Sequence, residues 1–154
     1  MAYEKSAATR TKLHFDVVAN RLSEHASQAV CKRATIVLDT SMAGNPDAFN
    51  PAKLLLATLA ACMLKDIERG VPILKFELRG VEVRVHGVRQ DVPPRMESIT
   101  YEIEVDTDEP EHRLALLHEN IRKYGTVFNT VAPGADLSGL LTRKPLGSVI
   151  DALK

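Results

Sequence analysis

Apolar and polar residues alternate in two stretches near the start of the chain, and this pattern predicts strands. The first stretch covers residues 13–17 and the second covers residues 30–39. Residues 19–29 between them are mostly polar and predict a turn, while residues 40–49 combine Gly, Asn, Pro and Asp, as loops do. The small, polar residues 1–10 are expected to fray.

The longest apolar stretch of the chain predicts a buried helix over residues 52–69. Asn50 suits the N-cap of this helix and Pro51 suits its first position. The stretch is apolar nearly all round between residues 54 and 64, which is typical of a helix buried on most of its faces. Gly70 and the proline two residues after it predict the end of the helix.

A β hairpin is predicted after the long helix. Apolar residues occupy alternate positions over residues 74–85, with a change of parity at Gly80 that predicts a bulge or bend. They alternate again over residues 99–105, and the proline-containing segment 90–94 joins the two runs. The two runs therefore predict antiparallel strands.

An amphipathic helix follows the hairpin, and the rest of the chain is expected to be mostly loop. The helix is predicted to begin near Asp108 and to end at Gly125. Its apolar face is formed by Leu114, Leu117, Ile121 and Tyr124. Beyond it, one weak strand is predicted near residues 137–142. Because strands do not alternate regularly with helices, the predicted fold class is α+β.

The size and composition of the chain fit one globular domain over residues 1–154, of which 45% are hydrophobic and 26% are charged. Lysine plus arginine equal aspartate plus glutamate at 20 each, so the basic excess typical of nucleic-acid or anionic-membrane binders is lacking. No apolar run has the length of a membrane helix, and we expect no signal peptide. Neither nucleic acid nor a membrane is therefore an expected partner, and the cytoplasm is the expected location.

Sequence motifs for cofactors and metals are lacking. The chain has no phosphate loop and no dinucleotide fingerprint, so no cofactor is expected. Its five histidines are scattered without the spacing of metal ligands. His118-Glu119 begins like a zinc-protease motif, but Arg122 stands where the second histidine of that motif belongs. A metal site is therefore not expected.

Cys62 is the residue to which the sequence allows chemistry to be assigned. It lies inside the predicted apolar helix, where a free cysteine commonly acts as a small buried hydrophobe. A reactive cysteine needs a cation or a helix N-terminus nearby, and Cys62 is about three turns beyond Asn50. Lys65 is the cation that this helix could place beside it; otherwise an arginine must come from elsewhere in the fold or from a partner chain.

Residues 50–62 resemble the signature of the OsmC/Ohr family of thiol peroxidases, named for osmotically inducible protein C and organic hydroperoxide resistance. That signature reads Asn-Pro-Glu-(Glu/Gln)-Leu, then a small or apolar run, then Ala-Cys; here it begins Asn-Pro-Ala-Lys-Leu and ends at Cys62. The resemblance covers about residues 11–145. It implies an OsmC-like fold with antiparallel sheets wrapped around long central helices, in an interlocked homodimer with its sites at the subunit interface.

The resemblance also implies a chemistry. In that family the helix cysteine attacks an organic hydroperoxide and becomes a sulfenic acid, a second cysteine closes a disulfide, and a dithiol restores the pair. The resemblance assigns the nucleophile to Cys62 and a supporting arginine to Arg21, with Arg33 as the alternative. Two positions depart from the pattern: Gly125 replaces the second cysteine, although the Val, Asn and Thr that follow match, and Ala52 replaces a supporting glutamate.

Two functions stay open on these grounds. The first is a one-Cys thiol peroxidase that reduces organic hydroperoxides through Cys62 and is restored by an external thiol, since a sulfenic acid without a resolving cysteine otherwise over-oxidises. The second is a non-catalytic or weakly redox-sensing protein that holds a small lipid-like ligand in an apolar pocket at the dimer interface. Cys31, the other cysteine, is expected on the strand face opposite Ile36, to be more exposed than Cys62, and not to form a disulfide with it.

Overall fold

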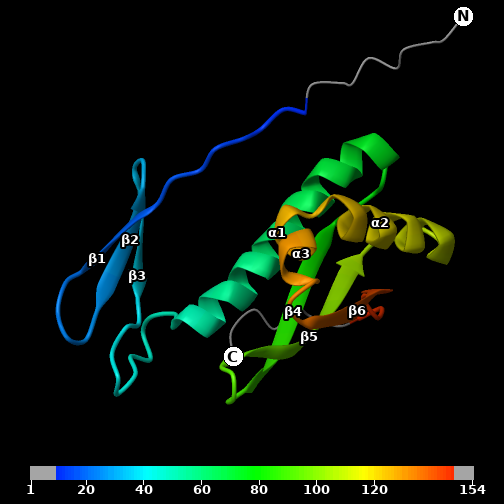
Figure 1. Ribbon diagram of the computed structural model, residues 1–154. Coiled ribbons are helices and arrows are strands. Elements are labelled where there is room, and N and C mark those ends of the chain that lie inside the picture. The colour runs from blue at the N-terminus through cyan, green and yellow to red at the C-terminus, as the bar shows by residue number, and fades with distance from the viewer. Residues whose placement is uncertain (1–9, 148–154) are drawn as a thin grey trace, which may run out of the picture. The chain divides into compact units, whose positions relative to one another are not determined.

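The computed structural model describes residues 10–147, and the chain divides after Pro51 into two compact units. Figure 1 labels the helices and strands of both units. The prediction that the N-terminus frays concerns residues 1–9 almost entirely and lies outside the described residues. The single domain over residues 1–154 stays a prediction.

Three short antiparallel strands form the sheet of the N-terminal unit. They are β1 (Val18–Arg21), β2 (Ser27–Cys31) and β3 (Ala34–Leu38), in the order β1-β2-β3. The strand predicted over residues 13–17 is wrong, because these residues are exposed and lie outside any strand. The polar segment predicted as a turn over residues 19–29 is shorter than expected, since both of its ends belong to strands.

The single strand predicted over residues 30–39 is two strands joined by a tight turn. Lys32 has φ = 55° in this turn, a left-handed conformation that few side chains adopt. Ala29 pairs with Ile36, and Cys31 pairs with Ala34. Because residues directly opposite each other share a face, Cys31 lies on the face of Ile36, and the expectation that it lies on the opposite face is wrong.

The N-terminal sheet leaves much apolar surface uncovered. Ser27 and Ala29 in β2 are buried, but Ile36 and Val37, on opposite faces of β3, are 51% and 53% exposed. Large exposed apolar areas of this kind commonly mark contact with another protein chain or a ligand.

Helix α1 (Pro51–Leu74) begins where the sequence predicts it but does not end at Gly70. Gly70 is buried, and a Cβ there would lie 3.3 Å from the side chain of Leu117. Because Gly70 has no side chain, Leu117 can pack closely against the helix at this point. The helix continues through Pro72. Packing of the surrounding residues offsets the free-energy cost of the helical hydrogen bond that Pro72 cannot donate.

The second sheet has the order β4-β5-β6. Strands β4 (Gly80–Gln90) and β5 (Arg95–Asp106) pair antiparallel, which confirms the predicted hairpin. The register shift lies between Val88 and Arg89, so the bulge predicted at Gly80 is misplaced. Apolar alternation before Gly80 spans the end of α1 and a connection instead of a strand.

Strand β6 (Asp136–Arg143) confirms the weak strand predicted near residues 137–142, but it pairs parallel with β5. The antiparallel sheets that the resemblance implies thus include one parallel pair, β5 with β6. A parallel neighbour requires a crossover connection. Helices α2 (Glu111–Tyr124) and α3 (Thr126–Val131) form that crossover.

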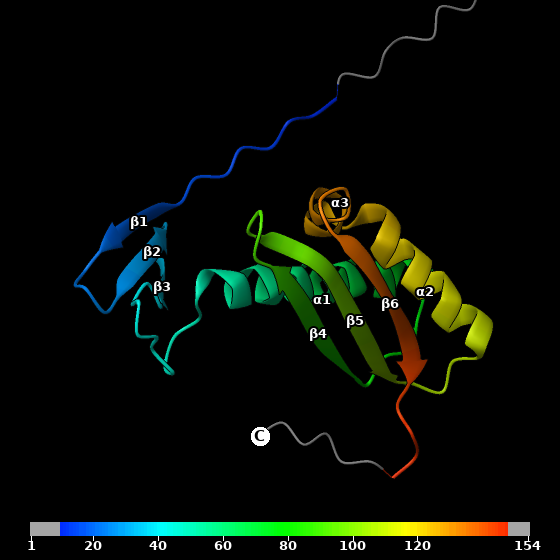
Figure 2. The ribbon, with the colours of Figure 1, turned by 60° about the horizontal axis from the view of Figure 1, so that its bottom comes forward.

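The second unit packs α1 and α2 on one face of its sheet (Figure 2). Alternate residues of β5 point into this core while Thr100 and Glu102 between them are exposed, as the sequence pattern predicts. Tyr124, expected on the apolar face of α2, is instead 49% exposed, and α3 was not predicted at all. The core side chains of β5, α1 and α2 are Ile99, Tyr101, Ile103, Val105, Leu59, Met63, Ile67, Leu114, Leu117 and Ile121.

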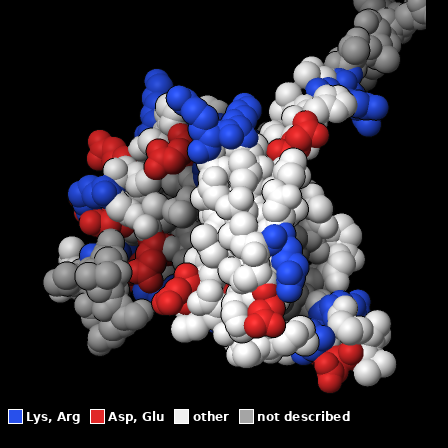
Figure 3. All heavy atoms as spheres, turned by 90° about the vertical axis from the view of Figure 1, so that its left-hand side faces the viewer, with Lys and Arg blue, Asp and Glu red and all other residues white. Residues whose placement is uncertain are grey.

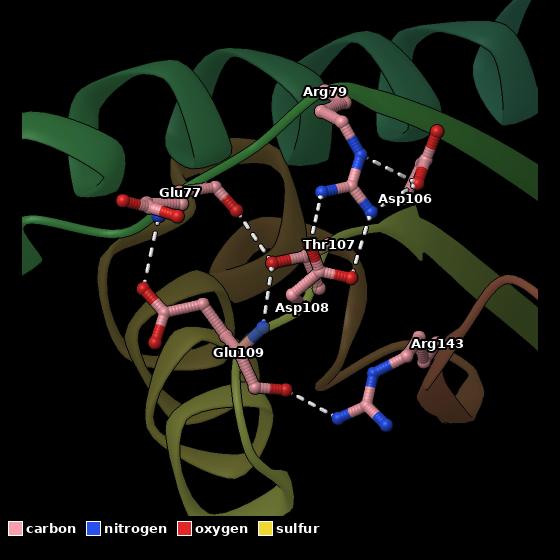
Figure 4. Close-up of polar contacts among 7 residues, drawn as sticks. All are labelled: Glu77, Arg79, Asp106, Thr107, Asp108, Glu109 and Arg143. Atoms are coloured by element: carbon pink, nitrogen blue, oxygen red, sulfur yellow. Dashed lines mark hydrogen bonds and ion pairs between the residues drawn. The ribbon is translucent and has the colours of Figure 1, made fainter.

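Polar side chains fasten the end of this sheet to the start of α2 (Figure 4). The Arg79 guanidinium donates to Asp108 at 2.7 Å and to Asp106 at 2.8 Å. Arg143, at the end of β6, donates to the backbone carbonyl of Glu109. These bonds join the beginning of β4, the end of β5 and the end of β6 to the connection that precedes α2. The cluster consists of Glu77, Arg79, Asp106, Thr107, Asp108, Glu109 and Arg143.

Candidate functional site

Cys62 lies in the middle of α1, between two residues that the core covers completely. Leu59 and Met63 are both 0% exposed, whereas Cys62 itself is half-buried. Its Sγ–H donates a hydrogen bond to Oδ2 of Asp66 at 3.6 Å. Residues four apart on a helix lie on the same face, so the helix itself brings the thiol and the carboxylate together.

Asp66 is a buried carboxylate, with only 7% of the residue exposed. Its Oδ1 lies 3.1 Å from Nη2 of Arg69, one turn further along α1. The Arg69 guanidinium in turn lies over the ring of Tyr124, 5.1 Å from its centroid. Burial raises the pKa of the Asp66 carboxyl above its usual value, while Arg69 and the hydrogen bond from Cys62 act in the opposite direction.

Gly125, which lies between α2 and α3, is directly next to this carboxylate. A Cβ at this position would lie 2.9 Å from Oδ2 of Asp66, the same oxygen that accepts the Cys62 hydrogen bond. The position that the family resemblance assigns to a second cysteine is therefore next to the partner of Cys62. In this chain the carboxylate of Asp66, instead of a second thiol, occupies that space.

The structure places the other sequence-predicted residues as follows. Lys65 is exposed, and the side chain bonded to Cys62 is Asp66. Ala52 lies in the first turn of α1. Arg21 ends β1 and Arg33 lies in the turn between β2 and β3, both in the N-terminal unit. The approach of either arginine to Cys62 therefore stays a prediction.

Two residues of this site, Asp66 and Arg69, were missed by the sequence analysis. Their signal was present in the spacing, since Asp66 follows Cys62 by four residues and Arg69 follows Asp66 by three. Of this segment, the sequence pointed only to Lys65 as a possible partner of Cys62. The contact with Gly125 has no comparable local signal, because Gly125 lies far away in the sequence.

A second polar pair, part-buried, joins β5 to α2 in this unit. The hydroxyl of Tyr101 and Nε2 of His118 are 2.7 Å apart, and the two rings meet edge to face. Burial raises the pKa of Tyr101 and lowers the pKa of His118, and the charge of Arg122 lowers both. His118 is thus a partly buried, hydrogen-bonded histidine whose neutral form is favoured by burial and by the charge of Arg122.

These features define a class of α+β protein in which a long helix carries a half-buried cysteine beside a mixed three-stranded sheet. The family described as OsmC-like protein matches residues 44–138, and the chain belongs to this family. No curated protein matches the chain. Within residues 10–147, none of the helices combines the length and apolarity needed to cross a membrane.

Solved structures with the same fold include proteins from several bacteria. An OsmC-like protein from Mycoplasma pneumoniae superimposes with a TM-score of 0.79 at 19% identity, over 88% of this chain and 100% of that chain. An organic hydroperoxide resistance protein OsmC from Legionella pneumophila gives 0.66 at 16% identity, over 87% and 100%. The organic hydroperoxide resistance protein OhrB of Bacillus subtilis gives 0.59 at 16% identity, over 84% and 98%. At these identities the comparisons establish the fold.

Proposed function

We propose that this protein is a one-Cys thiol peroxidase that reduces organic hydroperoxides through Cys62. The observation that carries the proposal is the half-buried Cys62 thiol on α1, hydrogen-bonded to a carboxylate, in a chain of the OsmC-like family. Two structures of the same fold are described as organic hydroperoxide resistance proteins. Gly125 favours a mechanism with one cysteine, because the position next to Asp66 has no thiol.

The proposed cycle uses an external thiol. The sulfur of Cys62 attacks the terminal oxygen of the hydroperoxide, the O–O bond breaks, and the products are a sulfenic acid and an alcohol. An external thiol then attacks the sulfenic acid, releases water and forms a mixed disulfide. A second thiol reduces that disulfide and restores Cys62. The cytoplasm, where such reductants are maintained, is the proposed location.

The proposed working form is a homodimer. Leu55 and Leu64 on α1 are 38% and 37% exposed, and the N-terminal sheet exposes Ile36 and Val37. Figure 3, which views the side of Figure 1 where β1–β3 are drawn, includes a broad area of uncharged side chains. A second copy of the chain would cover apolar surface of this kind, and obligate dimers often have no stable folded monomer. Light scattering that gives a stable monomer at micromolar concentration would contradict the dimer.

Peroxide consumption and protein mass test the reaction together. The purified protein is mixed with cumene hydroperoxide, first without reductant and then with dithiothreitol. We expect intact mass to increase by one oxygen, and by two oxygens under excess peroxide, and peroxide to be consumed catalytically once the dithiol is present. Cys62→Ser should abolish all three signals. Cys31→Ser is the matched control and should retain them.

Three results would count against this mechanism. A loss of two protons that maps to a bridge between Cys31 and Cys62 would make Cys31 the resolving residue. Loss of turnover in Cys31→Ser would do the same. An unchanged mass of the native protein under excess peroxide would leave the binding of a small apolar ligand as the better hypothesis.

A further inference from the structure

The carboxylate of Asp66 is held between the thiol and an arginine. Oδ2 accepts the hydrogen bond from Cys62 at 3.6 Å, and Oδ1 lies 3.1 Å from Arg69. The side chain of Asp66 is 9% exposed, whereas that of Arg69 is 43% exposed. One oxygen of this carboxylate therefore contacts the reacting sulfur, while the other is anchored by a cation that reaches solvent.

Building on the one-Cys reaction proposed above, we propose that Asp66 is a catalytic residue of that reaction. Its carboxylate is the general base that accepts the thiol proton of Cys62, and Arg69 is the positioning residue that orients it. A general base must lie within hydrogen-bond reach of the proton it removes, and the Cys62–Asp66 contact satisfies this condition.

The protons and electrons of the proposed step are balanced by Cys62, Asp66 and the hydroperoxide. As Sγ attacks the terminal oxygen of the hydroperoxide, its proton passes to Oδ2 of Asp66 and the O–O bond breaks. The departing alkoxide then takes the proton from Asp66 and leaves as an alcohol. Cys62 loses two electrons, the hydroperoxide gains them, and Asp66 is ionised again at the end of the step.

Gly125 provides the space in which this carboxylate lies. A side chain there would meet Oδ2 of Asp66 at 2.9 Å. The absence of a side chain at residue 125 and the position of Asp66 beside Cys62 are thus two parts of one arrangement. The family's second cysteine would have to displace the proposed base.

Arg69 is the charged group that favours the ionised form of Asp66, against the larger effect of burial. On α1, Arg69 pairs with it directly. From the end of α2, Tyr124 faces Arg69, and Lys123 lies over the same ring with its Nζ 5.2 Å from the centroid. Burial raises the pKa of Asp66 and Arg69 opposes this rise, so the base is expected to lose its activity as the pH falls through that pKa.

The test measures Cys62 with two reagents in a Cys31→Ser background, where Cys62 is the only thiol. Rates of carboxamidomethylation by iodoacetamide and of oxidation by cumene hydroperoxide are followed by intact mass between about pH 5 and 9. The parent should react at a nearly constant rate around neutral pH and more slowly where Asp66 becomes protonated. Asp66→Asn should lower both rates by about tenfold or more at pH 6 and should make both rates rise with pH, because the thiol must then lose its proton to solvent.

Two further variants separate the base from a general change in charge or packing. Glu68→Gln removes an exposed carboxylate on the same helix and should leave both pH profiles unchanged. Arg69→Gln removes the cation that lowers the pKa of Asp66, so the acid-side inflection should move to higher pH. Circular dichroism and light scattering of each variant check that the fold and the oligomeric state are retained.

The outcomes distinguish this inference from the proposed peroxidase function. If Asp66→Asn reacts with both reagents as fast as the parent, or faster, the proposal that Asp66 is a general base is overturned. The carboxylate of Asp66 is then either neutral or repels the thiolate. Peroxide consumption by the same variant at the parental rate would leave the peroxidase standing. The converse result is an alkylation rate that depends on Asp66, with no oxidation of the protein by cumene hydroperoxide. That result supports Asp66 as the proton acceptor and rejects the peroxidase function.

Discussion

Replacing Gly125 by alanine should destabilise the protein through a steric conflict that includes Asp66. The added Cβ would lie 2.9 Å from Oδ2 of Asp66 and 3.0 Å from both the Ile121 carbonyl oxygen and the Phe128 Cβ. Gly125 has φ = −69° and ψ = 113°, which alanine adopts without strain. The lower entropy of the unfolded alanine chain contributes about 0.4–1 kcal/mol of stabilisation, whereas overpacking costs about 1–3 kcal/mol. We expect a net loss of about 1–2 kcal/mol.

A double-mutant cycle tests whether Asp66 is part of this conflict. Asp66→Ala removes the carboxylate, so Gly125→Ala should cost at least about 0.5 kcal/mol less in that background. The free energy of unfolding is measured by urea denaturation followed by circular dichroism, at one fixed protein concentration because a dimer's stability depends on concentration. Gly134→Ala is the matched control, since the nearest atom to its Cβ would be the Val131 carbonyl oxygen at 3.7 Å. This control should be neutral or stabilising by up to about 1 kcal/mol.

The reasoning is refuted if Gly125→Ala has the same cost with and without the Asp66 side chain, within about 0.3 kcal/mol. That result would mean that the carboxylate does not occupy the space beside residue 125. It would also remove the structural link between the missing second cysteine and the proposed base.

Two further predictions concern the frame that carries the site. Leu59→Ala, at a completely buried position of α1, should lower the free energy of unfolding by about 2–5 kcal/mol in the same urea assay. Glu109→Gln should lower stability at pH 7 and flatten the loss of stability in acid, as measured by melting temperature against pH. The hydrogen bond from Arg113 keeps the pKa of Glu109 below its usual value, so its stabilisation is present at neutral pH and is lost as the pH falls through that lowered pKa. A melting temperature of Glu109→Gln that follows the parent at every pH would contradict this assignment.

Periodicity along the chain was sufficient to predict those helices and strands whose buried face is set by their own sequence. The alternation over residues 99–105 predicted the buried face of β5, because each strand presents every second side chain to one face. The Asn50-Pro51 start of α1 and the apolar spacing of α2 are local signals of the same kind. The family signature likewise placed Cys62 on the long helix from one continuous segment.

Tertiary packing decided what these local signals could not. Gly70 reads as a helix end in sequence, but it is buried against Leu117, and this packing carries α1 through Pro72. Strand direction was equally hidden, because the alternation of β6 is the same whether it pairs parallel or antiparallel.

Part of the candidate site can likewise be predicted from the sequence, and part of it only from the structure. The spacing of Cys62, Asp66 and Arg69 is a property of one helix, and the sequence alone carries it. The place of Gly125 beside Asp66 depends on how the end of α2 packs against α1, so two residues distant in the chain meet only in the folded protein. A periodic pattern specifies which face of an element is apolar, but it does not specify which distant residue that face will meet.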